Sequence, residues 1–280
     1  MKMLICKPSI NKNTNISIIV PVLNNKEKIT RNLKSICSQI NDKVELIIID
    51  GKSTDGTQTE ILKFSEHINY FISEPDNGIS DAFNKGIKLS TSNNILILNS
   101  DDWLSDMQIE IYQNNLKYLE NNYQFLYGNI IVHKENIKYI IKGDINYPKK
   151  IETRMPSINH PTILIKKSVF DKIGLFNKHY KFAMDYDLLL RAHIENFKGK
   201  HINNLYTNVS LGGVSDKYFI YALNEQRIIA KNYNNKIILN EILFLFFLFK
   251  SFFRRILEFF LFKNTVVKLR SFYDKNLNSL

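Results

Sequence analysis

The chain has 280 residues, of which 44% are hydrophobic and 23% are charged. This length and balance are typical of one large α/β domain, alone or with a short appendage, and they argue against a disordered chain. The formal net charge of +11 indicates an anionic partner, which could be a nucleic acid, an acidic membrane surface or a phosphorylated substrate.

The N-terminal residues 1–8 contain too short an apolar stretch for the core of a signal peptide, so we expect a cytoplasmic protein. The two cysteines, Cys6 and Cys37, lack the spacing of a metal site. They predict two ordinary thiols in a reducing compartment.

The first half of the chain alternates strand-like and helix-like segments. Strands are expected at apolar and β-branched runs, which are residues 16–20, 44–49, 68–72 and 95–98, and Pro21 is expected to end the first of them. Helices are expected at residues 27–40, 57–64 and 79–89. This alternation predicts a mostly parallel, Rossmann-like sheet flanked by helices.

The segment from residue 124 to residue 213 is more irregular. We expect a hairpin from residues 125–132 and 137–141, and a strand at residues 160–165. Helices are expected at residues 167–173 and 185–194.

The C-terminal segment, residues 216–280, differs in composition. Residues 242–249 form an unbroken apolar run, and Lys250, Arg254 and Glu258 then recur at a spacing that places them in one stripe along a helix. Charges in the middle of the segment argue against a spanning helix. They favour an amphipathic helix at a membrane surface, through residues 241–262. The alternative is a helix docked on a neighbouring domain or on the partner in a homodimer.

The carboxyl ends of the predicted strands, where such sheets bind ligands, are rich in acids. Asp50 and Asp55 follow the second predicted strand, and Asp101 and Asp102 follow the fourth. The glycine-rich loops G-x-G-x-x-G and G-x-x-x-x-G-K-[ST] are absent. A bound diphosphate would therefore need a divalent metal, for which Asp101 and Asp102 are well placed. On position alone, these two acids fit the start of the next helix equally well.

Three segments in order resemble the family 2 glycosyltransferases: IIVPVLN at residues 18–24, IIDGKSTDGT at residues 48–57 and LNSDD at residues 98–102. The resemblance covers about residues 16–215 and implies a GT-A fold. It implies a nucleotide-sugar-binding half, about residues 16–120, and an acceptor-binding half at residues 121–215. We expect the residues after 215 to form a separate helical tail.

The resemblance also implies roles for individual residues. Those implied to bind the nucleotide-sugar, with UDP as the expected nucleotide, are Pro21, Asn24, Asp50, Asp55, Asp81, Asn99 and Ser100. The run from Asn99 to Asp101 takes the place of the D-x-D motif, with Asn in place of the first acid. Asp101 would then bind Mn²⁺ or Mg²⁺, and Asp102 would support it.

Residues 184–191 resemble the acidic motif that supplies the general base of inverting members. Asp185 is the matching residue, and Met184 stands where an acid usually precedes it. A carboxylate suits this role because it can take the proton of the acceptor hydroxyl group, while a metal stabilises the departing diphosphate. The alternative for Asp185 is an acid that only favours a helix N-terminus.

Residues 160–162 and 212–215 resemble a subgroup that builds bacterial surface polysaccharides, which implies a glycan or lipid-linked acceptor at the inner face of the cell membrane. His160 and Arg191 are candidates for contacts with the acceptor or the diphosphate. A structural role is the alternative for His160, and an ordinary surface charge is the alternative for Arg191.

Other functions fit less well. A processive polysaccharide synthase needs a Q-x-x-R-W motif, but the one tryptophan is Trp103. A nucleic-acid partner is not expected, because no basic-aromatic motif of the known modules occurs. A catalytically silent, membrane-associated binding protein with the same fold remains the alternative, although such a protein would not need both Asp101 and Asp185.

Overall fold

The computed structural model describes residues 2–6, 14–134, 137–210, 218–234, 236–260 and 277–279. The strands are β1 (Lys2–Cys6), β2 (Ile16–Val22), β3 (Val44–Asp50), β4 (Tyr70–Ser73), β5 (Asn94–Ile97), β6 (Trp103–Leu104), β7 (Phe125–Lys134), β8 (Ile137–Ile141), β9 (Leu164–Lys166), β10 (Gly199–Ser210) and β11 (Leu277–Ser279). The α-helices are α1 (Lys26–Cys37), α2 (Thr57–Leu62), α3 (Ile79–Leu89), α4 (Gln108–Asn121), α5 (Lys167–Ile173), α6 (Met184–Ile194), α8 (Phe219–Tyr233) and α9 (Ile237–Phe260). Two short 3₁₀ helices are η1 (Tyr147–Lys149) and η2 (His160–Thr162).

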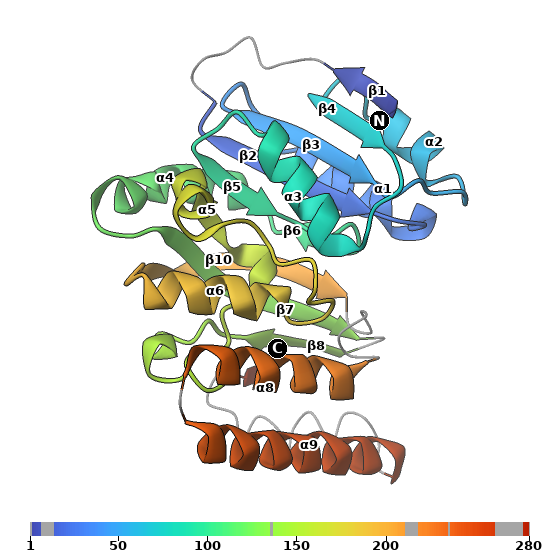
Figure 1. The fold of residues 1–280 in the computed structure, drawn as a ribbon. Helices are drawn as coiled ribbons and strands as arrows, with labels where there is room; N and C mark the ends of the chain where they lie inside the picture. Colours follow the sequence, from blue (N-terminus) through green and yellow to red (C-terminus); the bar gives the residue numbers. More distant parts are fainter. Residues whose placement is uncertain are drawn as a thin grey trace.

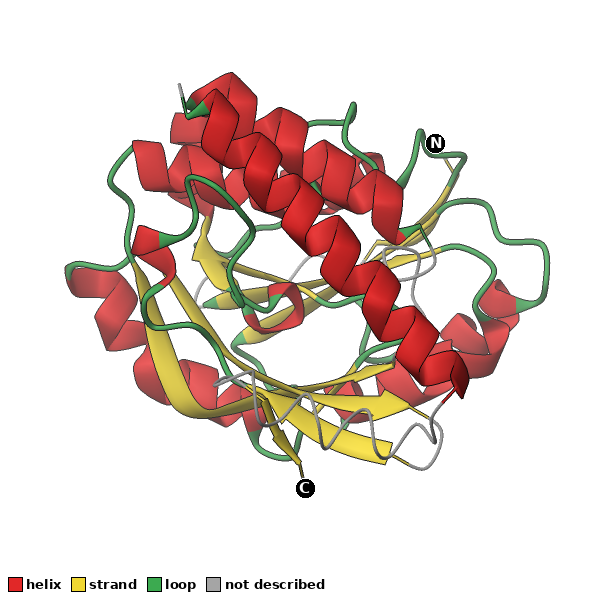
Figure 2. Ribbon diagram, turned by 90° about the horizontal axis from the view of Figure 1, so that it is seen from below, coloured by secondary structure: helices red, strands yellow, loops and turns green. Residues whose placement is uncertain are grey.

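The described strands form one sheet, in the order β1-β4-β3-β2-β5-β9-β7-β10-β6, and β8 and β11 continue it beside β7 (Figure 1). Strands β4, β3, β2 and β5 are parallel neighbours, as the alternation in the first half predicted. Strand β9 runs antiparallel to both β5 and β7, and β10 is parallel to β7. Helices cover both faces of the sheet (Figure 2). The predicted α/β class is therefore confirmed.

Strand β2 continues past Pro21, so the prediction that proline ends this strand was wrong. The carbonyl of Val22 accepts a hydrogen bond from Gly51 N–H at 2.8 Å, on the side of β3. Because successive residues of a strand direct their backbone groups to opposite sides, Pro21 directs its own toward β5, where pairing with β2 ends at Ile19. The missing N–H of proline therefore removes no bond from the β2–β3 ladder.

Other elements also differ from the expectation, and the short strands β1, β6 and β11 were not predicted. Residues 160–162 form a 3₁₀ turn containing Pro161 instead of the start of a strand, and β9 begins only at Leu164. Strand β10 was not predicted. Its pairing with β7 shifts register between His201 and Tyr206, which interrupts the alternation of buried and exposed residues by which strands are recognised.

Each face of the sheet has its own hydrophobic core, because side chains alternate along the strands. Ile19 and Ile47 belong to the core that also contains residues of α3, α5, α6 and α8. Ile18 and Ile48 belong to the opposite core, together with residues of α1, α2 and α4. Helix α3 approaches β2 closely because Gly86 faces Ile19, and a Cβ at residue 86 would lie 2.3 Å from the Ile19 side chain.

The described residues of the C-terminal segment form the helices α8 and α9 and the short strand β11, which pairs with β8. Helix α8 packs on α6 and contributes Ile229 and Ala230, both fully buried, to the core on that face. Helix α9 lies beside α8 at one end of the molecule (Figure 1). Among the described residues, no helix has the length and apolar composition needed to cross a membrane.

Some sequence-based expectations fall outside the described part of the chain. They concern residues 212–215, the end of the predicted membrane segment at residues 261–262, and the side chains of Arg254 and Glu258 in the predicted polar stripe.

Candidate active site

The loops after β2 and β3 are joined by hydrogen bonds. The backbone N–H of Asn24 donates to Ser53 Oγ at 2.7 Å, and Thr54 N–H donates to Asn24 Oδ1 at 2.9 Å. Asn24 has a φ of +47°, a backbone conformation that asparagine tolerates better than most residues. Together with Pro21, which is buried directly before this loop, these contacts form a frame at the carboxyl ends of the strands.

Asp50 is fully buried at the end of β3, and its hydrogen bonds stabilise this frame. Its carboxylate accepts hydrogen bonds from Ser53 N–H at 3.1 Å, from the Ser53 hydroxyl group at 2.5 Å and from the Ser73 hydroxyl group at 2.6 Å. The sequence predicted that Asp50 contacts the nucleotide base. In the structure, the hydrogen bonds that Asp50 accepts from Ser53 order the loop after β3.

Asp55 also stabilises the backbone around it through hydrogen bonds. Its carboxylate accepts bonds from Thr57 N–H at 2.9 Å, from the Thr57 hydroxyl group at 2.5 Å and from Lys26 N–H at 3.1 Å. The bond from the Thr57 side chain is the main reason why the pKa of Asp55 lies below its usual range. Asp55 therefore ties the start of α2 to the start of α1.

Asp81, in the first turn of α3, is held as an anion. Lys178 Nζ lies 2.6 Å from its Oδ1, Lys85 Nζ lies 3.3 Å from its Oδ2, and Asn77 N–H donates to Oδ2 at 3.2 Å. The bond from Lys178 is the largest cause that lowers the pKa of Asp81 to about 2. This acid therefore connects α3 to the loop after α5 and places two ammonium groups beside the predicted donor site.

The run predicted to meet the ribose and the metal follows β5. Ser100 is buried, and its Oγ accepts a bond from Asn25 Nδ2 at 2.8 Å. Asn99 is partly buried, and its Oδ1 has no hydrogen-bond partner within the described part of the chain. A buried acceptor without a partner is rare in folded proteins, which makes Asn99 Oδ1 available for a ligand group such as a ribose hydroxyl.

The two acids of this run have different environments. The side chain of Asp101 is 28% exposed, and Lys28 Nζ lies 3.9 Å from its Oδ2. Asp102 is buried, and its Oδ1 accepts a bond from Ser210 N–H at 3.3 Å. Burial, followed by the charge of Asp101, raises the pKa of Asp102 well above its usual range.

These environments bear on how a metal would be held. Within the described residues, no group of three or more His, Cys, Asp or Glu side chains could hold a metal ion. Mg²⁺ is commonly bound by one or two carboxylates, with substrate phosphates and water completing the coordination shell. Asp101 fits that kind of site because its carboxylate is accessible, while Asp102 fits as a buried support.

Asp185 lies in the first turn of α6 and faces His160 of η2. The Oδ1 atom of Asp185 accepts Tyr186 N–H at 2.8 Å. Burial raises the pKa of Asp185, and the nearby His160 opposes this effect. Burial lowers the pKa of His160, and Asp185 opposes this effect in turn. The two side chains are therefore close enough to influence each other's protonation.

His160 is held by ring packing. Its ring lies 5.3 Å from that of Phe83 and 6.4 Å from that of Phe176, measured between centroids. Both ring nitrogens are buried and have no hydrogen-bond partner among the described residues. An imidazole carries at least one N–H donor, so the site has an unused polar group beside Asp185.

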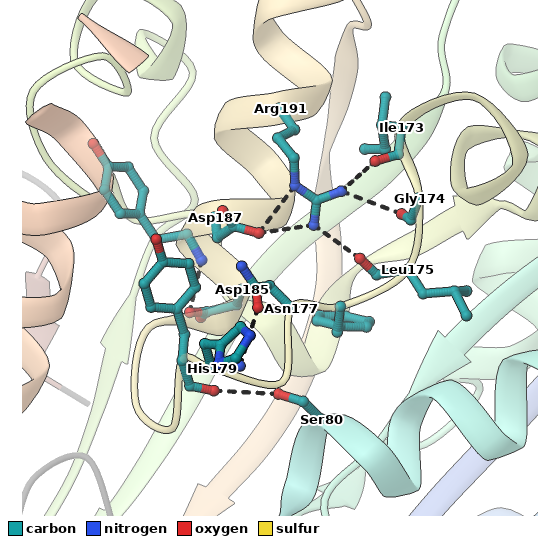
Figure 3. Close-up of polar contacts among 12 residues, drawn as sticks. Ser80, Ile173, Gly174, Leu175, Asn177, His179, Asp185, Asp187 and Arg191 are labelled. Carbon is teal, nitrogen blue, oxygen red and sulfur yellow. Dashed lines mark hydrogen bonds and ion pairs between the residues drawn. The ribbon is translucent and has the colours of Figure 1, made fainter. Parts of the chain in front are cut away.

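The guanidinium group of Arg191 binds other groups of the protein through all three of its nitrogens (Figure 3). Its Nε and Nη2 atoms lie 2.9 and 2.8 Å from Asp187 Oδ2. Nη1 donates to the carbonyls of Ile173 at 2.5 Å and Gly174 at 3.2 Å, and Nη2 donates to that of Leu175 at 3.0 Å. Arg191 is therefore not the surface charge that was the alternative: its side chain is only 16% exposed, and it fixes the loop after α5 to α6.

Three residues that shape the site were not identified from the sequence. Arg31 lies over the Trp103 ring at 3.6 Å, and its Nη2 donates to the carbonyl of Asp101 at 3.3 Å. Ser210, at the end of β10, binds Asp102 through its N–H, and Glu225 of α8 binds the backbone before Asp185. Each contact joins residues far apart in the chain, so no local pattern in the sequence indicates it.

The chain matches the model of the family "Glycosyl transferase family 2" over residues 17–183, which is more than half of its length. An uncharacterized glycosyltransferase of Rickettsia typhi is 32% identical over 181 residues, covering 62% of this chain and 57% of that protein. A PGL/p-HBAD biosynthesis glycosyltransferase of Mycobacterium bovis is 28% identical over 179 residues, covering 63% of this chain and 68% of that protein. The chain thus spans little more than half the length of the Rickettsia relative.

Solved structures are similar in fold. Mannosyltransferase PcManGT from Pyrobaculum calidifontis, in complex with GDP-Man and Mn²⁺, has a TM-score of 0.61 and 15% identity, and the match covers 87% of this chain and 73% of that one. TarS of S. aureus has a TM-score of 0.58 and 19% identity, covering 81% of this chain and 41% of that one. These likenesses confirm the predicted GT-A fold. The match of the family model over residues 17–183 shows that the chain belongs to glycosyl transferase family 2.

Proposed function

We propose that the protein is an inverting, metal-dependent glycosyltransferase that moves a sugar from a nucleotide donor to a hydroxyl group of a glycan or lipid-linked acceptor. The observation that carries this proposal is the pair of Asp185 and His160. A half-buried carboxyl group with a raised pKa lies beside an imidazole whose nitrogens have no partner among the described residues. Perturbed titratable groups of this kind are typical of reacting sites.

Asp185 is the proposed general base. Its carboxylate takes the proton of the acceptor hydroxyl group while that oxygen attacks the anomeric carbon, and the bond from this carbon to the nucleoside diphosphate breaks. A base works best when its pKa lies near the working pH, and burial moves the pKa of Asp185 in that direction. His160, kept neutral by burial, is proposed to orient the acceptor or a diphosphate oxygen with a hydrogen bond.

The donor is proposed to lie over the frame formed by Pro21, Asn24 and Asp50, with Asn99 Oδ1 directed to the ribose. Asp101 would hold Mn²⁺ or Mg²⁺, supported by Asp102, and the bound cation would stabilise the charge of the departing diphosphate. PcManGT was solved with GDP-Man and Mn²⁺, and TarS with UDP-GlcNAc, which supports a nucleotide-sugar and a divalent cation here. UDP is the nucleotide we propose.

A donor screen tests this function directly. The protein is heated with UDP-, GDP-, CDP- and dTDP-sugars in the presence of Mn²⁺, Mg²⁺ or EDTA, and sugar release is measured in parallel. We expect sugars of one nucleotide to raise the melting temperature and to be turned over slowly, in both cases only with metal. An equal rise in melting temperature and an equal release of sugar in EDTA would refute the metal dependence. Binding without turnover, even with candidate acceptors, would favour the catalytically silent alternative.

We also propose that α9 binds the anionic inner surface of the cell membrane, where lipid-linked precursors of bacterial surface polysaccharides would be the acceptors. Helix α9 exposes large apolar side chains along its described length, among them Ile242, Leu245, Phe246, Phe249 and Phe252. Lys250 is exposed on the same helix, and the net charge of the chain is +11. Apolar burial combined with attraction to anionic lipid is how interfacial helices bind.

Flotation with vesicles tests the membrane proposal against the dimer alternative. Leu245→Glu combined with Phe249→Glu places charge at positions that are 60% and 71% exposed, and should abolish flotation with anionic vesicles. Ile145→Glu is the matched control, because Ile145 is 68% exposed but lies outside α9. If the parent forms a dimer that the double variant loses, and neither protein floats, α9 is a dimer interface instead.

A further inference from the structure

Glu225, in the middle of α8, binds the backbone that leads into α6. Its Oε1 accepts Lys181 N–H at 2.9 Å, and its Oε2 accepts Phe182 N–H at 2.8 Å, Ala183 N–H at 2.9 Å and Lys181 N–H again at 3.1 Å. One carboxylate thus gathers the amides of three consecutive residues. These residues end two positions before Asp185.

The start of α6 needs such an acceptor. The first N–H groups of a helix have no partner within the helix, and a polar side chain at the preceding position commonly binds one of them. Ala183 occupies that position in α6 and has no side-chain acceptor. A carboxylate at a helix N-terminus is also stabilised by the helix dipole. From another helix, Glu225 therefore places a carboxylate on the N–H of Ala183 and of the two residues before it, where the sequence 178–183 leading into α6 contains no acid.

Helix α8 is fixed well enough to impose this geometry. Ala222, Ile229 and Ala230 are buried, and they lie within about one and a half helical turns of Glu225. Arg227, on another side of α8, pairs with Glu241 of α9 at 2.8 Å. The packing of α8 therefore fixes Glu225 beside the loop that it binds.

We infer that Glu225 is a positioning residue for the proposed base: by fixing residues 181–183 it sets the direction in which Asp185 presents its carboxylate to the acceptor. The inference rests on the role proposed above for Asp185, and it extends the active site into the C-terminal segment. Within the described part of the chain, the charges of two titratable groups act on Asp185: His160 of η2 and Glu225 of α8. His160 lowers the pKa of Asp185, and the negative charge of Glu225 raises it.

The test compares Glu225→Ala and Glu225→Gln with Glu241→Gln, which removes an ion pair of the same segment without touching α6. Hydrogen exchange at the amides of residues 181–183 should accelerate at least about tenfold in Glu225→Ala and less in Glu225→Gln, which keeps one acceptor oxygen. In the donor assay, kcat should fall about 10–100-fold in Glu225→Ala, with the donor KM unchanged. Glu241→Gln should match the parent in both measurements.

The pH dependence adds a readout that a purely structural role would not move. Removing the negative charge in Glu225→Gln should lower the pKa of Asp185, so the acid limb of the kcat profile should move to lower pH. The same shift should appear when Asp185 is titrated by NMR, which requires no turnover.

Unchanged exchange at residues 181–183 in Glu225→Ala would overturn the inference, and so would accelerated exchange with an unchanged kcat. A parent protein that transfers no sugar from any donor would refute the proposed function instead. The exchange and NMR measurements would then still show whether Glu225 positions Asp185.

Discussion

The donor-side loops and the start of α6 hold their polar groups in opposite ways. In the loops after β2 and β3, Asp50 and Asp55 accept hydrogen bonds from residues of the same or the neighbouring loop. Beside α6, the nitrogens of His160 have no partner among the described residues, and the pKa of Asp185 is raised by burial. An unsatisfied buried polar group costs roughly 1–3 kcal/mol, so a fold keeps one mainly where it serves a purpose. We interpret the first region as a frame, and we propose that the second is where the reaction takes place.

Substitution of Asp185 should give the largest effect. Asp185→Asn keeps the shape of the side chain but cannot take a proton, so kcat should fall by about 10²–10⁴-fold. Donor-induced thermal stabilisation should stay near that of the parent, because Asp185 is not part of the donor frame. Asp171→Asn, at an exposed acid of α5, is the control. Turnover at the parental rate in Asp185→Asn would refute the assignment of the base.

Removal of the proposed metal ligand should give the next largest effect. Asp101→Asn should reduce metal-dependent transfer by about 10²-fold, because metal stabilisation of the leaving group contributes several kcal/mol. The melting temperature with donor and Mn²⁺ should then equal that with donor and EDTA. Asp106→Asn, at an exposed acid shortly after the run, should behave like the parent. Unaltered metal dependence in Asp101→Asn would show that the cation binds elsewhere.

A substitution within the frame should lower the stability of the fold more than the rate of sugar transfer. Asp50→Asn leaves one oxygen for the three groups that now donate to the carboxylate. We expect a loss of about 1.5–3 kcal/mol in the free energy of unfolding, measured by urea denaturation. Ser73→Ala, which removes one of these donors, should cost less. If Asp50→Asn weakened donor binding at unchanged stability, Asp50 would act on the nucleotide and not through the loop.

The pH dependence of Asp81 should give the smallest effect. Because its pKa is lowered to about 2, the Asp81 carboxylate stabilises the fold above its unfolded pKa of about 3.9. This contribution should disappear as the pH falls from about 4 to 2. Since Lys178 is half exposed, we expect at most about 1 kcal/mol. The difference in unfolding free energy between the parent and Asp81→Asn should shrink over that range, and a constant difference would contradict this account.

The sequence predicted what local patterns encode. Every strand and helix expected between residues 16 and 98 is present, because runs of Ile, Val and Leu alternate with helical spacing there. Asp50, Asn99 and Asp101 directly follow predicted strands, so the order of the chain alone places them at the carboxyl edge of the sheet. The sequence indicates Asp185 and His160 only as two separate candidates, since nothing in it predicts that η2 and α6 meet.

The remaining features depend on contacts between distant segments. Glu225 binds amides 42–44 residues earlier in the chain, and Ser210 N–H donates to Asp102 across a separation of 108 residues. The irregular pairing of β10 with β7 hides that strand from pattern analysis. For Arg191, the sequence shows an exposed-looking cation. Only the packed loop after α5 shows that three carbonyls and Asp187 already occupy its donors.

The docking of α8 on α6 determines where this protein can be divided. The family match ends at residue 183, and a boundary near residue 215 would look natural from composition alone. A fragment cut there would expose the core surface that Ile229 and Ala230 now cover, and it would lose the carboxylate of Glu225. The shortest fragment worth expressing therefore extends through Tyr233, because the described residues of α9 contribute no side chain to the two large hydrophobic cores.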